Sequence, residues 1–229
     1  MDTVLEYKSI LMQGTLVTVS LAVLSLLLSV LLGLLAASLK LSSSLMARRI
    51  GNIYVTLVRS VPDLVLMMLI FYGGQALVNH LGGLTGWWDY VDLNQFIAGV
   101  LTLGFIFGAY MAETFRGAIL AIPAGQHEAA VACGMNRFQV FRLVTWPQMV
   151  RHALPGFSNN WLVLVKSTAL VSVIGLHDLV WNAVSAGRST QQLFSFLSAV
   201  LIIYLCITAV SDLCLRKLDR RFSAGVERR

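Results

Sequence analysis

Charged residues are scarce in this chain, and their scarcity excludes a water-soluble globular protein. Only 12% of the 229 residues are charged, whereas 57% are hydrophobic and the mean hydropathy is +0.77. A soluble domain carries roughly 25% charged residues. Apolar runs of about 18 residues or more recur along the chain, and a helix of that length crosses a hydrocarbon core of roughly 30 Å. The composition therefore predicts an all-α, polytopic membrane protein.

Cysteines and clustered metal ligands are also scarce. The chain has three cysteines without a CxxC spacing and four histidines without the spacing of a metal site. Lys166-Ser167 resembles the end of a phosphate-binding loop, but Val165 stands where that motif requires glycine. We therefore predict no disulfide framework, no metal site, no cofactor held by this chain and no enzymatic activity of its own.

Five apolar segments are long enough to span a membrane. We expect spans at about residues 11–39, 54–79, 95–120, 155–177 and 191–215. Polar residues interrupt the fourth segment, which leaves a four-span or re-entrant arrangement as the alternative. In the third segment Gly104 and Gly108 have the GxxxG spacing that permits close helix packing.

Lys and Arg residues lie in short clusters beside alternate apolar segments. The loop between the second and third segments contains Asp89 and Asp92 but no Lys or Arg, and its side of the membrane holds only Lys8 and Arg188. Because positive residues are retained on the cytoplasmic side, we expect the N-terminus outside and the C-terminus inside. Such clusters do not form the basic face of a nucleic-acid-binding protein. They consist of Lys40, Arg48, Arg49, Arg137, Arg142, Arg151, Arg216, Lys217, Arg220, Arg221, Arg228 and Arg229.

The longest hydrophilic segment lies at about residues 121–152. It predicts one short helix over 124–133 that stops at Gly134, then a second that Asn136 caps and that runs to Pro147. Small residues at Ala129 and Ala130 would let another surface approach the backbone closely, which favours docking of a partner protein. The alternative is an amphipathic helix lying on the bilayer surface.

Sequence motifs in this segment resemble a known family. Glu128-Ala129-Ala130, Gly134 and, after nine further residues, Val144-Thr145-Trp146-Pro147 resemble the EAA loop of ATP-binding-cassette (ABC) importer permeases. The usual ending of that loop is Ile-x-Leu-Pro, so Val144 and Trp146 depart from it. Residues 59–65, 112–117 and 166–170 are similar to blocks of polar amino acid permeases, particularly the histidine/lysine-arginine-ornithine type and its opine and arginine relatives.

The resemblance implies a single permease domain over residues 1–229, of the type I importer fold, in a bacterial inner membrane. It implies inward transport of histidine, arginine, lysine or ornithine. The expected partners are a second permease subunit that is a paralogue of this chain, two copies of a cytoplasmic ATPase that uses ATP and Mg, and a periplasmic amino acid binding protein. Glu128, Ala129, Ala130 and Gly134 would receive the movement of the ATPase. An ion-coupled secondary transporter is the alternative, although such proteins usually contain internal repeats.

Ionisable residues inside apolar spans are costly and therefore mark functional or paired sites. Asp63 is either a helix-capping residue or a contact for a cationic substrate. Glu113 is a candidate for the substrate path, but Arg116 lies three residues away and offers an ion pair. We expect Lys166 to neutralise an acidic group of this chain or of its partner.

Neutral polar residues of the fourth span are further candidates for the substrate path. They either line it or form hydrogen bonds between helices. In the resembling family, an acidic residue often follows the asparagine equivalent to Asn159, and this chain has Asn160 there. The substitution implies that the partner permease contributes much of the charge recognition. The four candidates are Asn159, Asn160, Ser167 and Thr168.

Overall fold

The computed structural model describes residues 2–223, and every regular element in that range is a helix. Five helical segments are long and apolar enough to cross a membrane, which confirms the predicted all-α class. The elements are α1 (Asp2–Glu6), α2 (Lys8–Leu41), α3 (Leu45–Ser60), α4 (Asp63–Thr85), α5 (Gln95–Leu120), α6 (Ala124–Ala132), α7 (Arg137–Val140), a π-helix (Phe141–Thr145), α8 (Trp146–Ser167), a 3-10 helix (Thr168–Ile174), α9 (Leu179–Ser189) and α10 (Leu193–Ser223). Arg228 and Arg229 lie outside the described residues.

Helices α2 and α5 form the centre of the bundle, and small residues bring them together. A Cβ atom added at Gly104 would lie 2.5 Å from Leu28, and one added at Gly108 would lie 2.9 Å from Leu32. Gly33 on α2 approaches Met111 in the same way, with a distance of 2.5 Å from the added Cβ. The GxxxG spacing thus acts in helix packing, as predicted.

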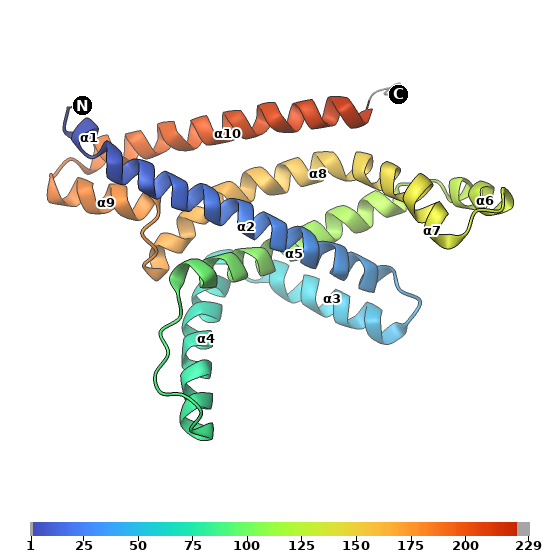
Figure 1. Cartoon of the computed structure of the whole chain (residues 1–229), viewed down its shortest axis with the longest axis horizontal. Coiled ribbons are helices and arrows are strands. Elements are labelled where there is room, and N and C mark those ends of the chain that lie inside the picture. Colours follow the sequence, from blue (N-terminus) through green and yellow to red (C-terminus); the bar gives the residue numbers. More distant parts are fainter. Residues whose placement is uncertain (1, 224–229) are drawn as a thin grey trace.

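The second apolar segment is not the continuous span that we predicted at 54–79. Val61 and Pro62 are extended and separate α3 from α4, because a proline disfavours helical geometry at the preceding residue and lacks a backbone N–H. Helix α3 lies beside α2 and α5, whereas α4 leaves the bundle at a steep angle (Figure 1).

The break places Asp63 far from the first residue of α3 and from the last residue of α5. The 16 residues of α3 extend for about 24 Å at the usual helical rise. Asp63 contacts Tyr110, which precedes the end of α5 at Leu120 by roughly 15 Å of helix. The break therefore lies well away from the ends of the bundle, on a face where Arg59 is exposed and Asp63 is partly buried.

The fourth span is also longer than predicted. From Arg137 to Ile174 the helices follow one another directly, so the second short helix does not end at Pro147 and the span does not begin at residue 155. Pro147 lies in the first turn of α8, directly after the π-helix, in which the Trp146 N–H bonds the Phe141 carbonyl five residues earlier; this wider turn accommodates the N–H that the proline lacks. Pro155 lies inside α8, where it removes one further helical N–H donor.

The two ends of the bundle differ. Helices α1 and α9 and the start of α10 gather at one end, and α6 and α7 project from the other (Figure 1). At the first end Asp178 caps α9 by accepting a hydrogen bond from the Trp181 amide at 2.8 Å. Leu11, Leu179 and Phe196 form an apolar core there.

Candidate translocation path and coupling surface

Two opposite charges meet at the break between α3 and α4. The hydroxyl group of Tyr110 on α5 lies close to the carboxylate of Asp63. The guanidinium carbon of Arg59 lies 5.3 Å from the centre of the Tyr110 ring, in a cation–π contact. Within residues 2–223 neither Arg59 nor Asp63 forms an ion pair. The break thus holds an acid and a base that do not neutralise each other.

A line of neutral polar groups continues from Tyr110 to α8. Thr114, one turn further along α5, donates a hydrogen bond to the Tyr110 carbonyl at 3.3 Å. The side-chain amide of Asn160 donates to the Thr114 hydroxyl at 3.0 Å. A Cβ atom at Gly156 would lie 2.8 Å from Thr114, so glycine permits this approach of α8 to α5. The predicted candidates Asp63 and Asn160 are joined by two residues that the sequence did not single out.

Asn159 belongs to a different face of α8. It is exposed, as are other residues of α8 that recur every three or four positions and therefore share that face. Lys166 is one of them and makes no ion pair within the described part of the chain, so the acid that was expected to neutralise it is not found there. An acidic group in a partner subunit remains a prediction. The face is formed by His152, Pro155, Asn159, Val163 and Lys166.

Ser167 and Thr168 do not join the polar line. Thr168 is fully buried, donates to the Val165 carbonyl at 2.7 Å and lies 3.2 Å from the hydroxyl of Tyr204 on α10. It thus connects helices, which was the second use that the sequence allowed. Ser167 is partly exposed beside it.

Glu113 lies near the C-terminal ends of α2 and α5, between two cations. Arg116 approaches its carboxylate at 3.1 Å, which confirms the predicted ion pair. Lys40, at the end of α2, donates to the other carboxylate oxygen. Its side chain is only 11% exposed, so the interaction joins two helices in a largely dry setting. Glu113 therefore serves as a structural ion-pair partner of two cations. The sequence did not identify Lys40 as one of them, although its position at the end of the first span was the feature that could have indicated it.

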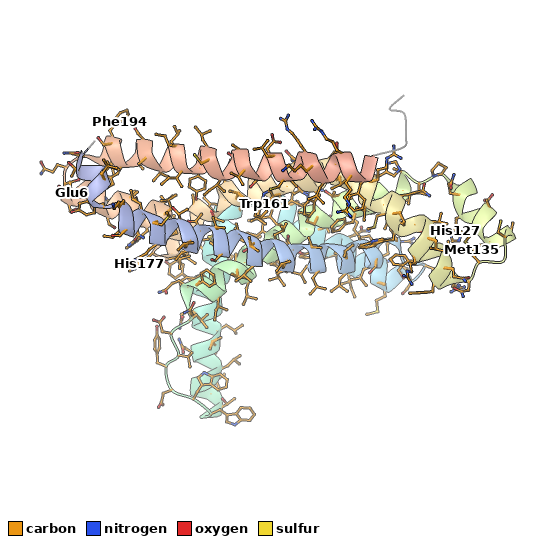
Figure 2. All side chains as sticks on the ribbon, turned by 45° about the horizontal axis from the view of Figure 1, so that its top comes forward. Glu6, His127, Met135, Trp161, His177 and Phe194 are labelled. Carbon is orange, nitrogen blue, oxygen red and sulfur yellow. The ribbon has the colours of Figure 1, made fainter. Side chains whose placement is uncertain are left out.

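Helix α6 and its turn form the projecting surface. Figure 2 shows His127 and Met135 at the extreme end of this part of the molecule. Glu128 and Ala129 are exposed, but Ala130 is only 5% exposed and therefore packs inward. Gly134 adopts a positive φ of 79°, a conformation that favours glycine after a helix. Of the four predicted coupling residues, three are open to a partner.

A capping box then starts the second helix of the projection. The Asn136 side chain accepts from the Gln139 amide at 2.9 Å, and the Gln139 side chain accepts from the Asn136 amide at 2.8 Å. This cap was predicted from the spacing. It sets the direction of a surface on which three large apolar side chains are exposed, namely Phe138, Phe141 and Leu143.

A bundle of apolar helices with a polar line through it, and a projection with small and apolar exposed residues, define a membrane permease that offers a docking surface to another protein. Residues 29–224 match the family described as "Binding-protein-dependent transport system inner membrane component", and the chain belongs to that family. It is therefore a transport component and not an enzyme.

Named relatives and solved structures agree with this family. The chain is 49% identical to the "Histidine/lysine/arginine/ornithine transport system permease protein HisQ" of Escherichia coli (strain K12), over 97% of each chain. It is 39% identical to the "Arginine ABC transporter permease protein ArtQ" of Haemophilus influenzae, over 95% of this chain and 96% of that one. A solved amino acid ABC transporter chain with 31% identity superposes with a TM-score of 0.81 over 95% of this chain and 96% of that one. The resemblance drawn from the motifs is confirmed.

Proposed function

We propose that this ABC importer permease carries basic amino acids, namely histidine, lysine, arginine or ornithine, into the cytoplasm. The observation that carries this proposal is the 49% identity along 97% of the chain to a permease named for those four substrates. The unpaired carboxylate of Asp63 at the helix break supports it, because a group of that charge suits a cationic solute.

The importer that we propose contains a second permease subunit, a paralogue of this chain. The exposed polar face of α8, with Asn159 and Lys166, supports a partner, since such groups are costly against lipid. Most of α4 is also uncovered, because only Met67, Phe71 and Gly82 are buried on it. The other partners are two copies of an ATPase, which would bind ATP and Mg, and a periplasmic amino acid binding protein.

The segment at about 121–152 is, in this proposal, the cytoplasmic coupling loop. Glu128, Ala129 and Gly134 would contact the ATPase, and the buried Ala130 would help to hold α6 in the projection, where this helix contacts the π-helix. Their exposure and burial support this division. The accessible apolar side chains of Phe138 and Leu143 supply further contact area.

The orientation that we propose places the N-terminus in the periplasm and the C-terminus in the cytoplasm of a bacterial inner membrane. The bundle supports it because the end of α10 lies toward α6 and α7, while α1 lies at the opposite end (Figure 1). Arg142 lies in the projection, and Arg216 and Arg220 lie near the end of α10, as the positive-inside rule requires.

The test is uptake of tritiated L-lysine by proteoliposomes that contain the permease pair, the ATPase and the binding protein. We expect uptake only with ATP inside the vesicles and binding protein outside. Uptake that proceeds without ATP and stops when the proton gradient is collapsed would overturn the proposal in favour of an ion-coupled transporter. A single-cysteine label at the exposed Cys133, reachable only from the cytoplasmic side, checks the orientation.

A further inference from the structure

The break between α3 and α4 brings together a positive and a negative side chain, and not only the acid that could bind a cation. Arg59 is in the last turn of α3 and Asp63 is the first residue of α4. The extended residues Val61 and Pro62 between them take the two side chains out of a common helix. Both side chains instead contact Tyr110, Arg59 over the ring and Asp63 at the hydroxyl group.

The arrangement is energetically unusual for a site inside a membrane bundle. Opposite charges in such surroundings gain most by forming a direct pair, as Lys40 and Glu113 do. Arg59 and Asp63 have no such contact, because Tyr110 engages each of them separately. The tyrosine carries no charge and so neutralises neither group. To neutralise the site, one negative group would have to lie beside Arg59 and one positive group beside Asp63.

An amino acid zwitterion supplies both groups. We propose that Arg59 binds the α-carboxylate and Asp63 the α-ammonium group of the transported amino acid; this inference rests on the proposed function. A guanidinium group suits a carboxylate because it donates two parallel hydrogen bonds. Bound in this way, the ligand neutralises both side chains without moving them from Tyr110.

The basic side chain of the ligand then extends along Thr114 and Asn160. These groups are neutral and already hydrogen-bonded to each other, so they tolerate side chains of different length. The site at the break would therefore recognise what all four proposed substrates share. Its place away from both ends of the bundle, at a discontinuous helix, is typical of substrate sites in membrane transporters.

Other ionisable residues of the described spans do not offer this pair of charges. The carboxylate of Glu113 already has two cationic partners, Lys40 and Arg116. Lys166 lies on the exposed face of α8 and has no acidic partner in residues 2–223. Arg59 and Asp63 are thus distinguished by being close to the same side chain while remaining unpaired.

The test measures binding to the purified permease–ATPase complex in nanodiscs, without the binding protein. The probes are tritiated L-lysine and two competitors, 6-aminohexanoate, which lacks the α-ammonium group, and cadaverine, which lacks the α-carboxylate. We expect Asp63→Asn to weaken L-lysine binding about tenfold and to leave 6-aminohexanoate unchanged. We expect Arg59→Gln to weaken L-lysine to about the same extent and to leave cadaverine unchanged.

Matched controls separate recognition from folding. Arg48→Gln removes another exposed arginine of α3, and Asp89→Asn removes an acid of the loop after α4; both should bind all three compounds as the unmodified complex does. Arg59→Lys keeps the charge and should restore part of the L-lysine affinity. Size-exclusion chromatography checks that each complex assembles.

Equal weakening of all three compounds in a variant, or unchanged L-lysine binding in Asp63→Asn and Arg59→Gln, would overturn the assignment. Weakened 6-aminohexanoate binding in Asp63→Asn would also overturn it, because the carboxylate would then serve the side-chain amine. These outcomes leave the proposed function standing if the unmodified complex still imports lysine with ATP. Failure of that import would instead refute the proposed function itself.

Discussion

Two groups of charged side chains meet neighbouring turns of α5, one near the C-terminal ends of α2 and α5 and the other at the break between α3 and α4, yet only the first group is neutralised by ion pairs. Glu113 is held between Lys40 and Arg116. Asp63, which contacts Tyr110 three residues earlier on α5, is not paired with Arg59. The comparison teaches that a charge inside a membrane span is not by itself a sign of function, because the distinguishing feature is whether the chain neutralises it.

The largest effect is expected from Glu113→Gln, which removes the acid of the paired group. It leaves Lys40, whose side chain is 11% exposed, without a counter-charge. Removing one member of a buried pair costs about 3 kcal/mol. We expect a clear drop in the thermal unfolding temperature of the detergent-purified complex, with L-lysine affinity of the remaining folded complex unchanged.

A matched control for that variant is Asp212→Asn, which breaks the pair with Arg216 on α10. The side chains of that pair are 43% and 70% exposed, so its loss should cost less than about 0.5 kcal/mol. Similar unfolding temperatures for Glu113→Gln and Asp212→Asn would mean that the pair on α2 and α5 does not stabilise the bundle, and the comparison would then fail.

Gly33→Ala tests the packing that accompanies the paired region. Its new Cβ atom would lie 2.5 Å from the Met111 Cβ and 3.2 Å from the Ala112 backbone nitrogen, so the helices must separate. We expect a loss of about 2 kcal/mol, measured by thermal unfolding. Gly73→Ala on α4 is the control: nothing lies within 4 Å of its added Cβ, and the better helix propensity of alanine should leave stability equal or slightly higher. A destabilised Gly73→Ala would show that α4 is packed more tightly in the purified complex than it is in this chain alone.

Hydropathy, loop charge and turn chemistry were enough to predict the helical class, the first and third spans and the capping box at Asn136. They did not reveal the break before α4, although Pro62 carried the signal, because an apolar run gives no sign of where a helix changes direction. The polar line was missed for a different reason. Tyr110 is 47 positions from Asp63 in the numbering, and only packing of α3 and α4 on α5 brings them together. Lys40 and Glu113 are likewise 73 positions apart.

Helix α6 offers a further contrast, between one alanine that is open to a docking partner and a neighbouring alanine that packs inside this chain. Ala129 is exposed and Ala130 is 5% exposed, so the two neighbouring alanines should respond differently to aspartate. We expect Ala129→Asp to lower ATP-dependent uptake about tenfold by placing a charge in the proposed interface with the ATPase, with an unchanged unfolding temperature. Ala130→Asp should lower the unfolding temperature as well, because it buries an unpaired carboxylate. Full uptake by Ala129→Asp would remove this residue from the coupling surface.

The smallest effect is expected at the opposite end of the bundle, where Asp178 extends the comparison to a single unpaired acid outside the spans. Asp178 is fully buried, one carboxylate oxygen has no hydrogen-bond partner in residues 2–223, and burial raises the pKa of the group from 3.8 to about 6. Because the pKa is higher in the folded protein, the carboxyl group favours folding most when protonated, and this contribution is lost as the pH rises from 3.8 through about 6.

Asp178→Asn keeps a good N-cap for α9 and removes that dependence. We expect it to be more stable than the unmodified protein by about 1 kcal/mol above pH 7, since relief of the buried charge exceeds the weaker cap, and to show no advantage near pH 4. Thermal unfolding across this pH range measures the difference; an advantage that is the same at both ends would mean that folding does not raise the pKa of Asp178, and would contradict the prediction.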